Sequence, residues 1–526
     1  MIITGDMLIG RAAVRGDAGT LRAMNPILAE ELDPPFGCGG AEEVEAACSL
    51  AQEAFHSYRE VSLDVRARFL ETIGQGLMDL GEELIERASA ETGLPKTRLE
   101  GERARTVNQL KLFAAVVRAG NWISAALDSP LPNRAPQARP DLRLRKIPLG
   151  PVAIFGASNF PLAFSVSGGD AASALAAGCP IVVKAHSAHL GTSELVGRVI
   201  QNAVAASGLH EGVFSLLLGD GNTIGANLVA HPAIKAVGFT GSRQGGIALM
   251  HIASCRPEPI PVYAEMSSIN PIFLLPGALS KRSEELARGF VDSMTLGVGQ
   301  FCTNPGLVIA QEGPALESFR RSAAEKIAGK DAGTMLTYGI QAAYRSGVQR
   351  LATTKGVQKL AEGLSGTGAC TAQVVFLSTD AAQFLAVPGL QDEVFGPASL
   401  LVSCRSADEM VALAEHLSGQ LTASLHLEAE DVPVAARLMP VLERKVGRIV
   451  VNGFPTGVEV SYAMVHGGPF PATSDNRTTS VGATAIERFL RPVCYQDVPE
   501  SLLPEALRDS NPLSLWRLRD GQIAQR

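Results

Sequence analysis

The chain has 526 residues, of which 46% are hydrophobic, so it is long enough to bury large cores in about two to four domains without disulfides. Its formal net charge of −7 leaves no basic surplus to neutralise phosphates, which argues against nucleic acid as a partner. The eight cysteines form no C-x-x-C pair and the histidines form no H-E-x-x-H pair, so the sequence predicts no metal. We find no secretory signal and no apolar run that could span a bilayer, and therefore expect a cytoplasmic protein without a membrane partner.

Residues 41–127 are predicted to be helical, because apolar residues recur every three or four positions in three stretches, 41–60, 64–91 and 102–122. Prolines spread over 130–140 then exclude a continuing helix. After them, Leu142 and Leu144 alternate with charged residues, which is typical of a half-buried strand. We expect this strand to pair with part of the polar tail beyond Pro469.

From residue 150 onward, short apolar runs alternate with helix-like segments. One series contains four such runs, 151–157, 179–185, 213–219 and 234–241. A second series extends from Ile272 to Val451. Strands that alternate with helices at this spacing indicate parallel βαβ units, so the sequence predicts an α/β fold.

Four places carry residues that could do chemistry. A Gly-rich turn, 239–246, follows a predicted strand and can bring backbone N–H groups to an anionic ligand, although an ordinary turn would look the same. Cys302 lies in a loop of Gly, Asn and Pro, where a thiolate can be exposed, whereas most cysteines are simply buried. Glu265 stands between two apolar stretches, and Asn159 ends a strand; each is a candidate for proton transfer or oxyanion binding, or an ordinary structural residue.

In this order along the chain, the four places resemble the motifs of the aldehyde dehydrogenase superfamily, and the resemblance covers nearly the whole sequence. It implies that Cys302 is the nucleophile, Glu265 the general base and Asn159 an oxyanion donor. For the cofactor it implies a further set of residues: Lys184 at one ribose, Gly241 and Ser242 in the nucleotide turn, and Glu393 with Phe395 in the motif that holds the nicotinamide ribose.

The resemblance also implies an architecture. It predicts a Rossmann-type dinucleotide-binding domain (1–129 and 150–265), an α/β catalytic domain (266–470), and a small β oligomerisation flap with a C-terminal tail (130–149 and 471–526). Because the flap strand suits pairing across a subunit interface, we expect a homodimer or a homotetramer.

NADP is the expected cofactor, with NAD as an alternative. NAD-preferring relatives carry a Glu three residues after the ribose lysine, where this chain has Ser187. A Glu there would repel a 2′-phosphate, whereas Ser187 can donate a hydrogen bond to it and Lys184 adds positive charge. Asn222 stands where NADP-linked relatives often carry an Arg, which leaves dual use of NAD open.

Within the superfamily, three stretches are similar to NADP-linked α-ketoglutarate semialdehyde (2,5-dioxovalerate) dehydrogenases: 155–196, 466–482 and 485–504. The implied reaction converts this small-molecule aldehyde to α-ketoglutarate. A broad-specificity aliphatic or fatty aldehyde dehydrogenase is one alternative, and a Cys-dependent acyltransferase or thioesterase without hydride transfer is another.

A substrate with a distal carboxylate needs a cation near the mouth of its tunnel. By resemblance, a helix with Arg103 and Arg105 lines this tunnel, and Arg105 is the preferred candidate. Phe160 and Phe454 are candidates for the tunnel wall. Each arginine could equally be a solvated helix residue, and each aromatic ring could equally belong to a core.

Overall fold

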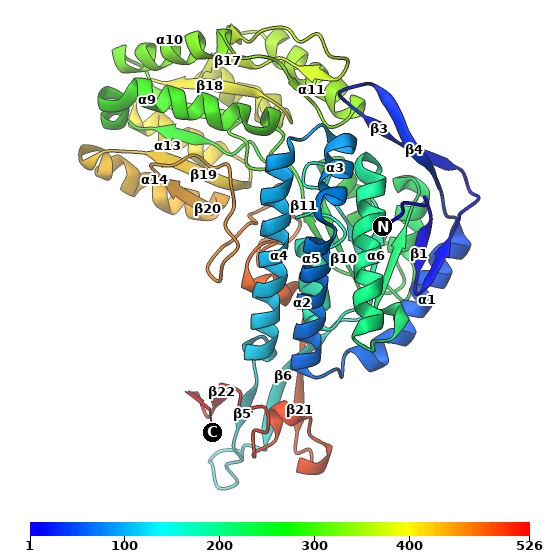
Figure 1. The fold of residues 1–526 in the computed structure, drawn as a ribbon. Coiled ribbons are helices and arrows are strands. Elements are labelled where there is room, and N and C mark those ends of the chain that lie inside the picture. Colours follow the sequence, from blue (N-terminus) through cyan, green and yellow to red (C-terminus); the bar gives the residue numbers. More distant parts are fainter. Residues whose placement is uncertain (526) are drawn as a thin grey trace.

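The computed structural model describes residues 1–525 and contains two seven-stranded, mainly parallel sheets and a smaller five-stranded sheet, each in its own part of the molecule (Figure 1). The first large sheet has the order β11-β10-β7-β8-β9-β1-β2. Its strands are β1 (Met7–Ile9), β2 (Ala12–Val14), β7 (Val152–Phe155), β8 (Ile181–Lys184), β9 (Phe214–Leu217), β10 (Ala236–Thr240) and β11 (Val262–Glu265). The helices around it are α1 (Ala41–Tyr58), α2 (Leu63–Asp79), α3 (Gly81–Thr92), α4 (Lys96–Ala119), α5 (Gly169–Ala177), α6 (Leu190–Ala206), α7 (Ala226–Ala230) and α8 (Arg243–Ser254).

The second large sheet has the order β15-β17-β18-β13-β12-β19-β20 and lies with its helices in the green to orange part of Figure 1. Its strands are β12 (Ile272–Leu274), β13 (Leu307–Gln311), β15 (Gln358–Glu362), β17 (Val375–Asp380), β18 (Ala398–Cys404), β19 (Gln420–His426) and β20 (Val446–Val451). Its helices are α9 (Pro276–Thr295), α10 (Pro314–Ala328), α11 (Tyr338–Thr353), α12 (Ala381–Ala386), α13 (Ala407–His416) and α14 (Val432–Lys445). Two short pairs complete the fold: β3 (Thr20–Asn25) with β4 (Glu30–Gly37), and β14 (Gly333–Thr334) with β16 (Thr371–Ala372).

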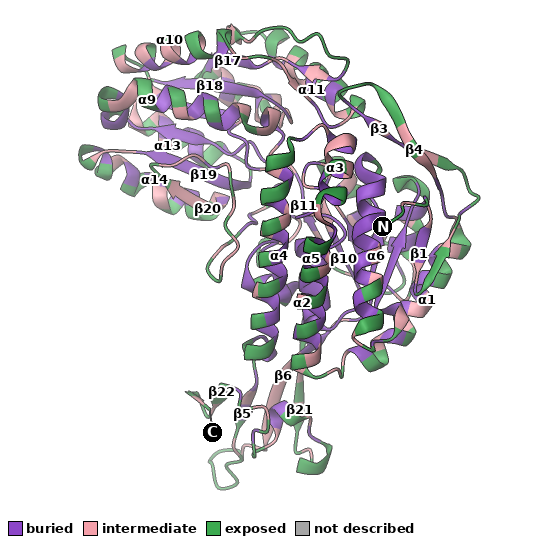
Figure 2. Ribbon diagram, in the orientation of Figure 1, coloured by how far each residue is buried: buried purple, intermediate pink, exposed green. Residues whose placement is uncertain are grey.

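The predicted α/β class is confirmed, and burial explains why the strands could be recognised. Every residue of β7, β9, β18 and β19 is buried, which matches the purple strands of Figure 2. Parallel sheets with helices on both faces need such continuous apolar strands, because neither face meets water.

The helical prediction for 64–91 is wrong in one respect, because this stretch forms two helices, α2 and α3. Gly81, the first residue of α3, has a φ of +55°, a left-handed conformation that glycine adopts without a steric penalty. The chain therefore turns between Asp79 and Glu82, and the apolar pattern alone does not reveal the break.

The small sheet is the flap, with the order β21-β6-β5-β22-β23, and it extends from the rest of the molecule at the bottom of Figure 1. As predicted, the strand that holds Leu142 and Leu144 pairs with the C-terminal tail, antiparallel. The strands are β5 (Ala126–Asp128), β6 (Leu142–Pro148), β21 (Leu490–Gln496), β22 (Arg517–Arg519) and β23 (Gln522–Ala524). β5, which precedes the predicted boundary at residue 130, also belongs to this sheet. Among residues 1–525, no helix has both the length and the apolarity that crossing a bilayer requires.

Candidate active site

The carboxyl ends of the first large sheet bring together residues that are far apart in sequence. Phe155 pairs in register with Lys184, and Thr240 pairs with Glu265, each at the last position of its strand. The strand order reverses between β7 and β10: β8 and β9 follow on one side of β7, whereas β10 and β11 lie on its other side. The connections that leave β7 and β10 therefore run toward opposite edges of the sheet. In open α/β sheets, ligands bind in the crevice that such a reversal creates.

Cys302 lies in a loop that comes from the second sheet and is fixed by Asn270. The Asn270 Nδ2 atom donates to the carbonyl oxygens of Cys302 and Asn304, both at 2.9 Å. On the other side, Gly299 has a φ of +64°, and a Cβ there would lie 2.4 Å from the carbonyl carbon of Gly396. Only glycine permits this approach, so the Cys302 loop and the loop that contains Glu393 meet at Gly299.

The Cys302 thiol, the His466 imidazole and the Glu265 carboxylate form one contiguous cluster. The His466 Nε2 atom lies 3.4 Å from Cys302 Sγ and 2.9 Å from Glu265 Oε1. Ser480 donates to the other carboxylate oxygen, Oε2, at 2.8 Å. Glu265 and His466 are each only 1% exposed, whereas Cys302 is half-buried.

The surroundings set the charge of this cluster. Burial alone would raise the pKa of Glu265, but the contacts with His466 and Ser480 and the positive charge of Arg488 outweigh it, so the pKa lies below its usual value. Burial and the neighbouring Glu265 charge raise the pKa of the Cys302 thiol well above its usual value. At neutral pH the carboxylate is therefore ionised, and the thiol needs a partner that takes its proton.

Asn159 borders the same loop. It is buried, and its Nδ2 atom donates to the Gln300 carbonyl at 2.9 Å. A side-chain amide has two N–H donors, so one remains for an oxygen beside Cys302. Arg98 supports this arrangement, because it donates to the Asn159 carbonyl at 2.7 Å and its guanidinium stacks on the rings of Phe160 and Phe301.

The residues predicted for the cofactor lie at or just after the carboxyl ends of β8 and β10 and in the loop before β18. Gly241 donates its N–H to the Glu265 carbonyl, and Ser242 caps the N-terminus of α8, where the helix dipole favours an anion. Lys184 is half-buried, and burial lowers its pKa, while Ser187 is exposed nearby. A cavity of about 470 Å³ extends from Arg243 past Ser267 to Glu393, so Glu393 is the predicted residue that lines it.

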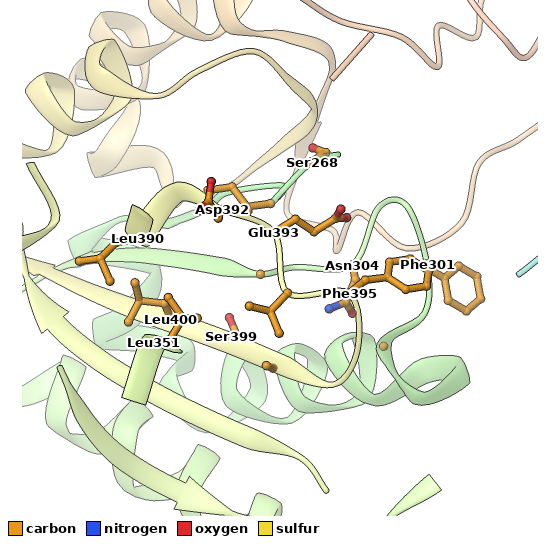
Figure 3. A pocket seen from close by; sticks show the side chains of 15 residues that line it. Ser268, Phe301, Asn304, Leu351, Leu390, Asp392, Glu393, Phe395, Ser399 and Leu400 are labelled. Carbon is orange, nitrogen blue, oxygen red and sulfur yellow. The ribbon is translucent and has the colours of Figure 1, made fainter. Parts of the chain in front are cut away.

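Glu393 and Phe395 lie on the loop before β18, where Figure 3 shows them close to Asn304 and Phe301 of the Cys302 loop. Burial raises the pKa of Glu393 to about 8, although Ser268 and Ser267 donate hydrogen bonds that lower it. A carboxyl group with this pKa is ready to pair with hydroxyl groups, as the expected contact with a ribose requires.

A second cavity, of about 260 Å³, opens onto the thiol from the other side. Cys302, Phe160, Phe301, Arg98 and Arg105 are among the residues that line it. The Arg105 guanidinium stacks on the Phe164 ring at 5.1 Å, and its Nη1 atom has no hydrogen-bond partner among residues 1–525. Its other contact, from Nη2 to the Val458 carbonyl, is long at 3.4 Å, so this cation is free to meet an anion.

Two residues predicted for the tunnel lie elsewhere. Arg103 donates to the Gly81 carbonyl at 2.6 Å, which holds its side chain against the start of α3. Phe454 packs against the His426 ring, with centroids 4.7 Å apart, and lines a different cavity beside α9. The sequence pattern failed here because Arg103 and Arg105 point to different sides of α4, two residues apart on a helix.

His466, Ser480 and Arg98 were not among the predicted site residues. His466 and Ser480 lie in the stretch 466–482, which the sequence distinguishes only by its resemblance to α-ketoglutarate semialdehyde dehydrogenases. A lone histidine in a Gly-Pro loop has no spacing that would link it to a cysteine 164 residues earlier.

The comparisons with known proteins agree with this geometry. Residues 14–484 match the model of the aldehyde dehydrogenase family. The chain is 61% identical to α-ketoglutaric semialdehyde dehydrogenase 2 of Azospirillum brasilense, over 99% of this chain and 100% of the relative. It is 45% identical to α-ketoglutaric semialdehyde dehydrogenase of Acinetobacter baylyi, over 99% of each.

Two solved structures share the fold. An NADP-dependent enzyme of E. coli has a TM-score of 0.80 at 21% identity and covers 94% of this chain and 98% of its own. A betaine aldehyde dehydrogenase of Staphylococcus aureus in complex with NAD+ has a TM-score of 0.81 at 18% identity and covers 94% and 95%. The chain belongs to the aldehyde dehydrogenase family.

Proposed function

We propose that this protein oxidises α-ketoglutarate semialdehyde (2,5-dioxopentanoate) to α-ketoglutarate, with NADP as the preferred cofactor. One observation carries the proposal: the identity of 61% to an α-ketoglutaric semialdehyde dehydrogenase extends over essentially the whole of both chains. Arg105 lines the cavity beside Cys302, and its Nη1 atom has no hydrogen-bond partner among residues 1–525; this supports the proposal, because the substrate carries a carboxylate at the end remote from its aldehyde.

Cys302 is the proposed nucleophile, and the ionised Glu265 carboxylate its proton acceptor. An ionised carboxylate only accepts hydrogen bonds, so the His466 Nε2 atom, 2.9 Å from Glu265 Oε1, donates to it and holds it beside the thiol. The carboxylate then passes the thiol proton to solvent. The thiolate adds to the aldehyde carbon and forms a hemithioacetal. When bound, a nicotinamide dinucleotide supplies the hydride acceptor for the oxidation.

Asn159 and Glu265 serve the remaining steps. The second N–H of the Asn159 amide and the backbone N–H of Cys302 donate to the oxyanion, and each such donor is worth about 3 kcal/mol of transition-state stabilisation. Oxidation leaves a thioester on Cys302. Glu265, with its lowered pKa, is ionised at neutral pH and can take a proton from the water that hydrolyses this thioester.

The cofactor is proposed to lie with its adenosine ribose at Lys184 and Ser187, its pyrophosphate at the Gly241–Ser242 turn, and its nicotinamide ribose at Glu393, next to Phe395. The first large sheet then forms the dinucleotide-binding domain, the second forms the catalytic domain, and the flap joins subunits in a homodimer or a homotetramer.

The first prediction concerns the substrate. Purified protein with α-ketoglutarate semialdehyde and NADP should produce NADPH, and Cys302→Ala should produce none, because the nucleophile is lost. Absorbance of the reduced nicotinamide measures both. No turnover of this aldehyde beside rapid turnover of long-chain fatty aldehydes would favour the broad-specificity alternative, and absence of NAD(P) binding would favour an acyltransferase.

The second prediction concerns proton transfer. The contact with His466 lowers the pKa of Glu265, so its removal in His466→Gln should raise that pKa. The acidic limb of the pH profile of kcat, which reports ionisation of the general base, should then move to higher pH. An unchanged acidic limb would exclude this role of His466; His416→Gln, on an exposed histidine, is the control.

The third prediction concerns the distal carboxylate. Arg105→Met should raise KM for α-ketoglutarate semialdehyde about 10–100-fold, the cost of a lost charged hydrogen bond, and leave KM for propanal within about twofold. Arg103→Met is the matched control, since its side chain lies outside the cavity. Equal losses for both aldehydes would mean that Arg105 supports the fold and does not recognise the carboxylate.

The fourth prediction concerns cofactor choice. Ser187→Glu places a carboxylate where the 2′-phosphate is proposed to lie, so kcat/KM should fall with NADP and be maintained or rise with NAD. Steady-state kinetics with both cofactors measures the ratio. A variant that still prefers NADP to the same extent would show that the 2′-phosphate lies away from Ser187.

A further inference from the structure

The cluster of Cys302, His466 and Glu265 has a property that its role in oxidation does not require. It brings together a sulfur, an imidazole nitrogen and a carboxylate oxygen, and these three atoms all lie within 4.8 Å of one another. They are the three ligand types that proteins use for Zn²⁺. The sequence showed no metal pattern, because the three residues come from segments that only the fold brings together.

We propose that Glu265, Cys302 and His466 form a binding site for Zn²⁺ that reversibly inhibits the enzyme. A tetrahedral zinc ion with ordinary bond lengths holds sulfur, nitrogen and oxygen ligands about 3.4–3.6 Å apart. The observed distance from Sγ to Nε2 is 3.4 Å, and that from Nε2 to Oε1 is 2.9 Å. Zinc geometry then requires the second distance to open by about 0.5 Å and the third, from Sγ to the Glu265 oxygen, to come to about 3.5 Å from a value of at most 4.8 Å.

The charges of the cluster support an ion at this position. A thiolate and a carboxylate in one buried cluster repel each other. A divalent cation between them balances both negative charges, which is the condition for burying them together. The ion would hold the thiolate tightly, so the sulfur could not add to an aldehyde.

The surroundings also allow an ion to enter. Glu265 and His466 are 1% exposed, so two ligands are held inside the protein, while Cys302 faces the 260 Å³ cavity. Three protein ligands leave the fourth position toward this cavity, where water can complete the coordination. Ser480 keeps Glu265 in place through Oε2, so Oε1 can exchange its contact with His466 for one with the ion.

Cobalt titration tests the site without reference to activity. Co²⁺ replaces Zn²⁺ in such sites, and a sulfur ligand gives it a charge-transfer band in the near ultraviolet. Reduced, cofactor-free protein should bind one Co²⁺ per chain with this band, and Zn²⁺ should displace it. Zn²⁺ should also block aldehyde oxidation and alkylation of Cys302 until EDTA is added.

Variants decide whether the three residues are the ligands. Cys302→Ala should remove the band, and His466→Gln and Glu265→Gln should each weaken Co²⁺ binding at least about 100-fold. Cys255→Ala and His416→Gln change exposed residues of the same types and should bind as the unmodified protein does. Thermal unfolding identifies any variant that does not fold. If one of His466→Gln and Glu265→Gln fails to fold, Co²⁺ binding by the other decides whether the cluster holds the ion. A band that persists in Cys302→Ala, or an unchanged affinity in a folded His466→Gln or Glu265→Gln, would overturn the proposal.

Discussion

The contact between the Glu265 carboxylate and the His466 imidazole is the interaction on which the site depends. Removing a carboxylate from water is costly unless other groups satisfy it, and Glu265 is almost completely buried. His466 and Ser480 each occupy one of its oxygens, so both ends of the carboxylate are fixed. The same imidazole nitrogen lies 3.4 Å from the Cys302 sulfur, so one side chain holds the carboxylate and borders the thiol.

Backbone constraints hold the parts of this cluster in register. Glu265 is the last residue of β11, where the parallel ladder with β10 fixes its height, and the Gly241 N–H donates to its carbonyl. Asn270 has a φ of +47° and donates to two carbonyls of the Cys302 loop, so the segment that leaves the first large sheet also positions this loop. Such strain at a functional site persists because several hydrogen bonds require it.

Much of the fold could be predicted from sequence, and the main candidate site residues could be singled out from it, for reasons that differ. The buried parallel strands show as unbroken apolar runs, and Cys302, Glu265 and Asn159 stand in local motifs. The break at Gly81 shows no pattern in the sequence, because it depends on the φ of one residue. The strand β5 shows none either, because three residues are too few for an alternation of apolar and polar positions. His466 could not be linked to Cys302, since their contact depends on the whole tertiary fold. Arg103 and Arg105 could not be told apart either, because residue spacing does not say which side of the helix faces a cavity.

The long separation between the partners of the cluster has a consequence for biosynthesis. Cys302 precedes His466 by 164 residues, and Ser480 follows Glu265 by 215. At roughly 5–20 residues per second, the ribosome adds those 164 residues in about 8–30 s. Throughout that interval the nascent polypeptide carries Cys302 without the imidazole that will stand beside it. The cluster can therefore assemble only after the ribosome has made nearly the whole chain, and a polypeptide truncated before His466 would lack it.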